Sequence, residues 1–192
     1  RISQKNLLFE EQHLERLTKA SRYFSFPFDP EELRQKIEKE CQACDFHQDY
    51  RLRITLSKSG EMELSRQILT PLSPSFCKAK LCLQEADLQT PFTYFKTTHR
   101  PHLSLGEQEI IYHNVAGELL ETSIGNLVLK INGKLYTPPT SQGILPGIYR
   151  QHLLETGQVE EKVLTLADFA QAEAIYGCNA VRGLYELEVN PK

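Results

Sequence analysis

A single lysine, Lys96, stands in a run of aromatic and β-branched residues from Phe92 to Thr98. If such neighbours shield a lysine from water, its charged form loses solvation, the pKa of the amine falls, and the amine can act as a nucleophile or a base. The ordinary alternative is a lysine whose side chain reaches from a strand into solvent, as lysines generally do. The local context of Lys96 leaves both interpretations open.

A second feature that could do chemistry is a turn that leads into a helix. Gly143-Ile144-Leu145-Pro146-Gly147 precedes Ile148 to Glu155, which has the pattern of the first turns of a helix. The N–H groups at a helix start have no partner within the helix, and the helix dipole places positive charge there. Such a start favours an anion, most naturally phosphate. An ordinary hairpin, loop and helix is the alternative, and this stretch alone does not decide between the two.

Between these features lies a carboxylate, Glu121. Pyridoxal 5'-phosphate needs a lysine that forms a Schiff base with it, an anchor for its phosphate and an acid beside its ring nitrogen. One lysine, one phosphate site and one acid meet these three needs. The combination therefore predicts pyridoxal 5'-phosphate as the cofactor, with Lys96 as the catalytic residue.

The elements that position these groups in the second half of the chain are mostly strands. Asn126 to Ile131 has the pattern of a strand, and Asn132-Gly133 is the strongest two-residue signal for a hairpin. Lys134 to Thr137 is the returning strand, which ends at Pro138-Pro139 because proline has no N–H to donate to a central ladder. The other predicted elements are strands at 109–113, 118–122 and 174–178, a helix from 164 to about 174, and a corner at 179–183.

The first half of the chain predicts two helices beside a small antiparallel sheet. A helical pattern from Leu7 to Glu40 is broken at Phe26-Pro27-Phe28, and Asp29 is a good N-cap for a second helix that begins at Pro30. Strands are predicted at 51–56, 61–66 and 78–84. A composition shift at Gln89-Thr90-Pro91 predicts one domain at 1–88 and a second at 89–192.

Charge and cysteine content limit the class of protein. The chain has 192 residues and a formal net charge of −3, so it lacks the basic stripe with which proteins bind nucleic acids. No apolar run reaches the length of a membrane span, and no signal peptide is visible. The five cysteines are odd in number and fit reduced thiols, and Cys41 and Cys44 have no second pair at zinc-site spacing. We expect a cytoplasmic protein that binds a small molecule, with no nucleic-acid, membrane or metal partner.

Five segments match the motifs of one enzyme family. They are His13 to Leu17 (HxxRL), Phe95 to Arg100 (HKTTxR), Glu121 to Asn126 (E-x4-N), Thr137-Pro138-Pro139 with Leu145 to Arg150 (TPP…LPGxxR), and Cys178 to Gly183 (NSxRG). In these segments, which extend over nearly the whole chain, the sequence resembles the class-IV aminotransferase superfamily, the fold-type IV pyridoxal-phosphate enzymes. Within that superfamily it looks most like aminodeoxychorismate lyase.

The resemblance implies a role for each matched residue. Lys96 would hold the cofactor as a Schiff base and transfer protons, and Glu121 would face the pyridine nitrogen. The residues implied for cofactor binding are Arg16, Glu121, Asn126, Gly147, Ile148, Tyr149, Asn179 and Ala180. Because the lyase substrate is a dicarboxylate, we expect arginines to bind it, and the candidates are Arg53, Arg100 and Arg182.

The resemblance also implies a fold and an activity. The fold is α/β (α+β), with the cofactor between a small α/β domain and a larger domain built on a β-barrel with helices, usually in a homodimer. The activity is that of a lyase of folate biosynthesis, which forms p-aminobenzoate and pyruvate from 4-amino-4-deoxychorismate. Three alternatives stay open: a class-IV aminotransferase for a D- or branched-chain amino acid, a degenerate homologue that binds the cofactor without catalysis, and a binding domain without cofactor.

The sequence departs from the family pattern at three places. Phe95 replaces the usual His before the lysine, which is a packing change. Tyr149 replaces the Thr of many transaminases, which removes one side-chain ligand of the phosphate and keeps the backbone N–H. The family normally begins with a further strand just before the position of Arg1, which is not an initiator Met, so we expect that strand to be missing. Its absence affects the substrate assignment more than the cofactor assignment.

Overall fold

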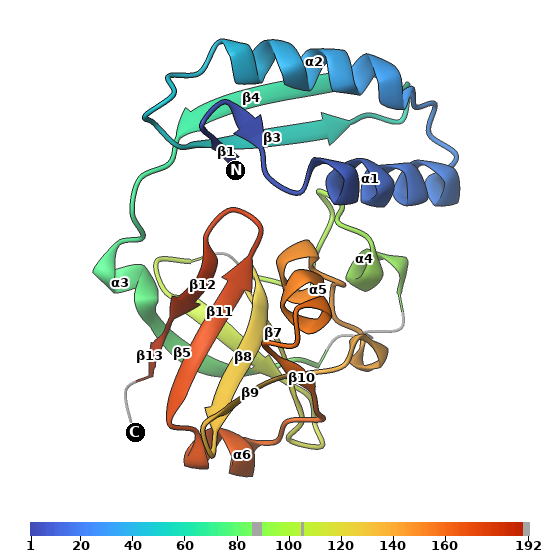
Figure 1. Cartoon of the computed structure of the whole chain (residues 1–192). Helices are drawn as coiled ribbons and strands as arrows, with labels where there is room; N and C mark the ends of the chain where they lie inside the picture. The colour runs from blue at the N-terminus through green and yellow to red at the C-terminus, as the bar shows by residue number, and fades with distance from the viewer. Residues whose placement is uncertain (86–89, 105, 190–192) are drawn as a thin grey trace. The chain divides into compact units, whose positions relative to one another are not determined.

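The chain forms two compact units, Arg1–Pro71 and Leu72–Lys192 (Figure 1). The computed structural model describes residues 1–85, 90–104 and 106–189. The boundary predicted between residues 88 and 89 is corrected to one after Pro71, and residues 86–89 lie outside the described part. The reason is β5 (Lys78–Leu83), which pairs in parallel with β6 (Glu109–His113) and therefore belongs to the second unit.

The first unit is a four-stranded sheet with two helices. The strands are ordered β2-β1-β3-β4, and each neighbouring pair is antiparallel. In chain order the elements are β1 (Ile2–Ser3), β2 (Asn6–Leu7), α1 (Glu10–Phe24), α2 (Pro30–Gln42), β3 (Tyr50–Leu56) and β4 (Met62–Ile68). Leu14 of α1, Leu33 and Ile37 of α2, and Met62 of β4 are buried in one apolar core. This unit thus closes its own core, as an independent unit must.

The residues next to the start of α2 determine where this helix begins. The carboxylate of Asp29 accepts hydrogen bonds from the N–H groups of Glu31 and Glu32, at 2.9 and 3.3 Å. Pro30 occupies the first turn, where its missing N–H costs no intrahelical bond. The prediction of a helix that begins at Pro30 is therefore confirmed.

The second unit is built on a nine-stranded sheet. Its main path is β10-β9-β8-β7-β6-β5-β13, and β11 pairs with both β8 and β12. The strands beyond β5 and β6 are β7 (Leu119–Thr122), β8 (Asn126–Ile131), β9 (Lys134–Thr137), β10 (Glu160–Glu161), β11 (Ala174–Asn179), β12 (Gly183–Glu186) and β13 (Glu188–Val189). The helices are α3 (Pro74–Cys77), α4 (Pro91–Tyr94), the 3-10 turn η1 (Thr140–Gln142), α5 (Ile148–Glu155) and α6 (Leu166–Gln171).

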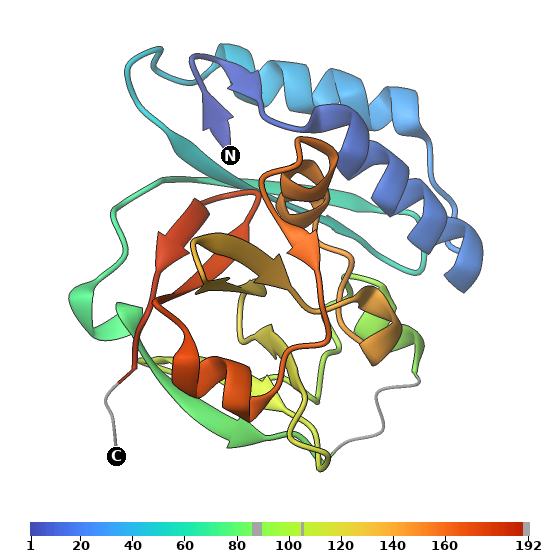
Figure 2. The ribbon, with the colours of Figure 1, turned by 60° about the horizontal axis from the view of Figure 1, so that its bottom comes forward.

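The strands of the second unit curve round a shared interior (Figure 2). Ile111, Leu119, Leu127 and Leu129, from β6, β7 and β8, are buried there without exposed surface. The mixed α/β fold that was predicted is confirmed, with strands that dominate this unit.

The hairpin between β8 and β9 is confirmed in its predicted register. Ile131 pairs with Lys134, and Asn132 and Gly133 both have positive φ, 50° and 75°. A two-residue turn with positive φ at both positions matches the twist of the flanking strands, and Asn-Gly adopts it readily. The turn therefore sets the register of β8, which carries the candidate site residue Asn126.

Candidate functional site

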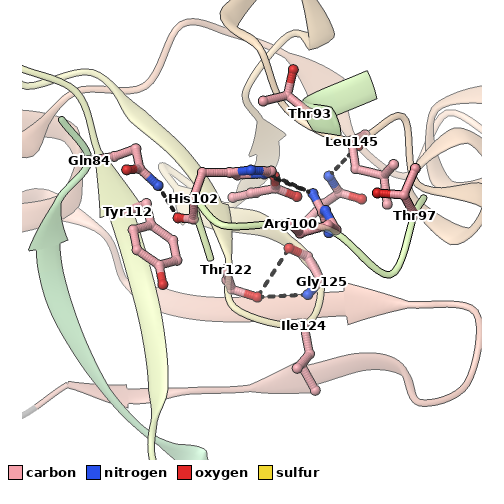
Figure 3. Close-up of polar contacts among 12 residues, drawn as sticks. Gln84, Thr93, Thr97, Arg100, His102, Tyr112, Thr122, Ile124, Gly125 and Leu145 are labelled. Carbon is pink, nitrogen blue, oxygen red and sulfur yellow. Dashed lines mark hydrogen bonds and ion pairs between the residues drawn. The ribbon is translucent and has the colours of Figure 1, made fainter. Parts of the chain in front are cut away.

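The turn between β7 and β8 places Glu121 and Asn126 directly opposite each other. Thr122 closes this turn, because its hydroxyl accepts a hydrogen bond from the N–H of Gly125 at 3.0 Å and donates one to the Gly125 carbonyl at 3.1 Å (Figure 3). A Cβ atom at position 125 would lie 2.5 Å from the carbonyl oxygen of Cys178 on β11. Glycine is therefore required where the turn crosses β11.

Glu121 is almost fully buried and is paired with an arginine. Its side chain is 5 % exposed and that of Arg100 is 14 % exposed, and Arg100 Nη2 lies 2.9 Å from Glu121 Oε1. His102 Nε2 lies 3.8 Å from the same oxygen and 3.4 Å from Arg100 Nη2. Figure 3 shows Arg100 and His102 side by side in this cluster. Glu121 and Arg100, both predicted as site residues, are thus brought together.

Lys96 lies four residues before Arg100 and is exposed. It follows α4, whose Pro91 begins a single helical turn instead of a strand. Of the two interpretations left open, the exposed position matches a side chain that reaches into solvent, and the catalytic role of Lys96 stays a prediction. Lys96 belongs to the same irregular segment as Arg100, whose Nη2 donates to Glu121 Oε1.

The loop before α5 is the segment predicted to bind phosphate, and we call it the cup. Gly147 is the N-cap of α5 and has no side-chain hydrogen bond to the helix start. Asn126 Nδ2 donates to the carbonyl of Leu145 at 2.8 Å, and a Cβ atom at position 147 would lie 1.9 Å from Asn126 Oδ1. Asn126, predicted to bind cofactor, therefore supports the loop whose backbone begins α5.

Arg150, in the first turn of α5, connects this helix to two neighbouring strands, a role that was not predicted. It is 2 % exposed, and its Nη2 donates to the carbonyl of Pro138 at 2.7 Å and forms a short ion pair with Glu161. Arg150 thus joins α5 to the ends of β9 and β10. The spacing of Pro138 and Arg150 in the TPP…LPGxxR segment was the signal that could have indicated this contact.

The corner between β11 and β12 lies beside the cup. Asn179 Oδ1 accepts hydrogen bonds from the N–H groups of Val181 and Arg182, at 3.0 and 2.9 Å. Gly183 closes the predicted corner with a positive φ, 72°, which glycine adopts readily. A Cβ atom there would lie 3.4 Å from the hydroxyl of Tyr149, so the side chain of Tyr149 links α5 to the corner. Ala180 is half-buried at the tip.

A buried carboxylate that sequence reasoning missed holds the β7–β8 turn. Glu109 has no exposed surface, and its Oε1 accepts hydrogen bonds from Ser123 Oγ at 2.8 Å and from the N–H of Ile124 at 3.0 Å. Tyr185 donates to Oε2 at 3.4 Å. Burial, and then the nearby charge of Glu109, raise the pKa of Tyr185 above its usual range. An acidic residue at the start of an apolar strand was the available signal.

Arg16 and Arg53 belong to the first unit. Arg16 is half-buried on α1, and Arg53 is exposed on β3. The contacts of Glu121, Asn126 and the cup all lie within the second unit. The roles predicted for these two arginines therefore stay predictions.

The family model for the class IV aminotransferases matches residues 1–187. The chain belongs to the class IV aminotransferase family. The motif segments that carry Glu121, Lys96 and Gly147 all belong to its second unit.

Two curated relatives align over most of the chain. A probable branched-chain-amino-acid aminotransferase of Thermotoga maritima is 27 % identical over 183 residues, which cover 86 % of this chain and 66 % of that protein. The aminodeoxychorismate lyase of Saccharomyces cerevisiae is 25 % identical over 84 % of this chain and 56 % of its own length. The chain thus spans less than two thirds of each of these relatives.

A solved structure supports the fold. The crystal structure of a putative amino-acid aminotransferase from Mesorhizobium loti matches with a TM-score of 0.78 and 27 % identity, over 94 % of this chain and 91 % of that chain. The family match and this structure confirm the predicted fold-type IV architecture. No helix in the described part of the chain is long and apolar enough to cross a membrane.

Pyridoxal phosphate is the cofactor of this family, so the alternative of a binding domain without cofactor is set aside. The residues present fit the group. The start of α5 has no side-chain cap, Gly147 leaves no room for a Cβ atom beside Asn126, and the buried Nε of Arg100 has no hydrogen-bond partner among the described residues. A bare helix start suits a phosphate, and a buried acid suits a ring nitrogen.

Proposed function

We propose that the protein is a pyridoxal-phosphate-dependent lyase that forms p-aminobenzoate and pyruvate from 4-amino-4-deoxychorismate. The observation that carries the proposal is the 2.9 Å hydrogen bond between Arg100 and Glu121. It connects the KTTxR segment, which favours the lyase over the aminotransferases, to the acid proposed to face the ring nitrogen. The identity to the yeast aminodeoxychorismate lyase also supports this assignment.

Lys96 is proposed as the catalytic residue. When bound, the cofactor supplies an electron-poor ring that takes up the electron pair released at the substrate carbon that bears the amine. Lys96 Nζ removes the proton from that carbon, C4. The C–O bond to the enolpyruvyl group then breaks, and this group takes up a proton and leaves as pyruvate. The remaining ring becomes aromatic, which drives the reaction forward.

The other site residues hold the reacting groups. The N–H groups of Ile148 and Tyr149, with the dipole of α5 and the charge of Arg16, bind the phosphate, and Asn179 and Ala180 border it. Ionised Glu121 keeps the ring nitrogen protonated. Because the substrate carries two carboxylates, Arg53 and Arg182 are proposed to bind them.

An aminotransferase is the second candidate, and the identity to the Thermotoga maritima relative favours it. Both candidates use the same cofactor and the same lysine. They differ in the step after the proton is removed: the lyase breaks a C–O bond, whereas the aminotransferase returns a proton elsewhere and passes the amine to a 2-oxoacid.

One pair of assays separates the two candidates. The purified protein, loaded with pyridoxal phosphate, is given 4-amino-4-deoxychorismate, and p-aminobenzoate is followed by its fluorescence. In parallel it is given a branched-chain or D-amino acid with a 2-oxoacid, and the new amino acid is measured. Product in the first assay alone supports the lyase, and product in the second alone overturns it. A protein that binds the cofactor and turns over neither substrate is the degenerate homologue.

We also propose a homodimer in the cytoplasm. The homodimer is carried over from the family resemblance, and the cytoplasmic location rests on the five cysteines, all of which are free thiols. Size-exclusion chromatography with light scattering tests the first part, because a mass of one chain would contradict it.

A further inference from the structure

Arg100 was expected to bind substrate, but its guanidinium is directed at Glu121. Arg100 Nη2 lies 2.9 Å from Glu121 Oε1, and both side chains are largely removed from water. An ion pair with little exposure is screened weakly by solvent. An arginine is also charged at every pH of interest. The pair is therefore a fixed feature of the site and is not a surface contact.

Only one oxygen of the Glu121 carboxylate is engaged. Arg100 Nη2 and, at 3.8 Å, His102 Nε2 both face Oε1, whereas Oε2 accepts no hydrogen bond from the described residues. A donor on one oxygen fixes the carboxylate plane and leaves the other oxygen for a second donor. A protonated ring nitrogen is a donor of this kind.

In the described part of the chain, the other titratable groups that border the small space beside Glu121 are His102, whose Nε2 lies 3.8 Å from Oε1, and Tyr112. The hydroxyl of Tyr112 is already bonded by the N–H of Ser104 at 2.7 Å. Among the described residues, Arg100 is the permanent cation that pairs with Glu121.

We propose that Arg100 is a positioning residue for Glu121, which it orients and neutralises so that Glu121 Oε2 meets the cofactor's ring nitrogen. The inference rests on the role of Glu121 in the proposed function, and it withdraws Arg100 from the substrate-binding arginines. A positive charge beside this carboxylate also opposes a further proton on the cofactor. Arg100 thereby sets the pH at which the bound cofactor changes its protonation state.

The test measures the visible absorption of the bound cofactor against pH, without substrate. Arg100→Gln removes the charge, and we expect the spectral transition to move upward by about one pH unit, because a nearby positive charge no longer opposes protonation. Arg100→Lys keeps the charge and should restore most of the wild-type transition. Arg51→Gln, which removes an exposed arginine of β3, is the matched control and should leave the transition in place.

A double variant gives a second readout that does not depend on the stability of one protein. If Arg100 acts through Glu121, adding Arg100→Gln to Glu121→Gln should move the transition no further than Glu121→Gln alone. An Arg100→Gln protein with the wild-type transition and only a raised KM would overturn the inference in favour of a substrate-binding role. Full additivity in the double variant would also overturn it. A spectral shift in a protein that makes no p-aminobenzoate would refute the lyase assignment and leave the inference in place.

Discussion

The side chain of Asn126 fills the space that a Cβ atom at position 147 would need, with its Oδ1 at 1.9 Å. The same side chain donates to the carbonyl of Leu145 at 2.8 Å. The shape of the cup before α5 is therefore decided by one amide and by one missing side chain. A side chain at position 147 would therefore have to displace Asn126.

Gly147→Ala should weaken cofactor binding by at least about ten-fold, because the new methyl group must displace Asn126 and break its bond to Leu145. The dissociation constant of pyridoxal phosphate, measured by titration of the visible band, reports this. Gly106→Ala is the control, since the nearest atom to a Cβ there lies 3.9 Å away. Equal affinities in the two variants would contradict the proposed cup.

Lys96→Ala should abolish turnover and the absorption band of the covalently held cofactor, because no other group on the 95–100 segment can form the Schiff base. Borohydride should fix the cofactor to the wild-type protein and not to the variant, as intact-protein mass spectrometry would show. Lys58→Ala, at an exposed turn of the first unit, should behave as wild type. A variant that kept full activity would exclude the mechanism.

Glu109→Ala should reduce the free energy of unfolding by about 2–4 kcal/mol, because it leaves buried donors on Ser123 and Ile124 without an acceptor. Glu109→Gln keeps an acceptor for both and should cost less, about 1 kcal/mol. Urea unfolding followed by circular dichroism compares the two. If both variants lost the same stability, the hydrogen bonds to Oε1 would not be what holds the turn.

The buried thiol of Cys178 should make the protein less stable at alkaline pH. Burial raises the pKa of its thiol to about 12, whereas an unfolded thiol titrates near about 8.5. Because the pKa is higher in the folded state, this stabilisation is complete below the unfolded pKa and is lost as pH rises toward the folded pKa. The free energy of unfolding should fall by about 2 kcal/mol at about pH 10. Urea midpoints measured from pH 7 to pH 10 give the slope.

Cys178→Ala should reduce this slope above about pH 8.5, whereas Cys77→Ala, at a half-buried position, should keep it. Burial also raises the pKa of the Cys41 thiol, so part of the slope should remain in the Cys178 variant. Tyr185, whose pKa is also raised, adds a loss of the same sign only at higher pH. Parallel slopes in the two cysteine variants would show that Cys178 is not the group responsible.

Local sequence signals predicted most of the elements and few of the contacts. Asp29 and the pair Asn132-Gly133 determine their own helix start and hairpin through bonds to near neighbours, so a single sequence is sufficient there. β5 was assigned to the wrong unit because parallel pairing with β6 depends on residues far along the chain. β5 follows the first sheet closely in the sequence, but this short separation does not indicate with which strand β5 pairs.

The candidate site likewise has features that local sequence signals predict and contacts that they do not. The loop and helix start at α5 and the corner at Gly183 could be predicted from glycine and proline. The contact of Arg100 with Glu121 could not, because an arginine in a loop has many possible partners and only the fold selects one. The burial of Glu109 was missed for a related reason, since its three donors come from two distant segments.

Asn126 stands where three separate parts of the second unit join. Its backbone pairs with Glu121 on one side and with Cys178 on the other, and its side chain anchors the loop before α5. The proposed cofactor site therefore depends on contacts among β7, β8 and β11. We expect pyridoxal phosphate to bind after these strands have assembled, so that folding of this unit does not require the cofactor.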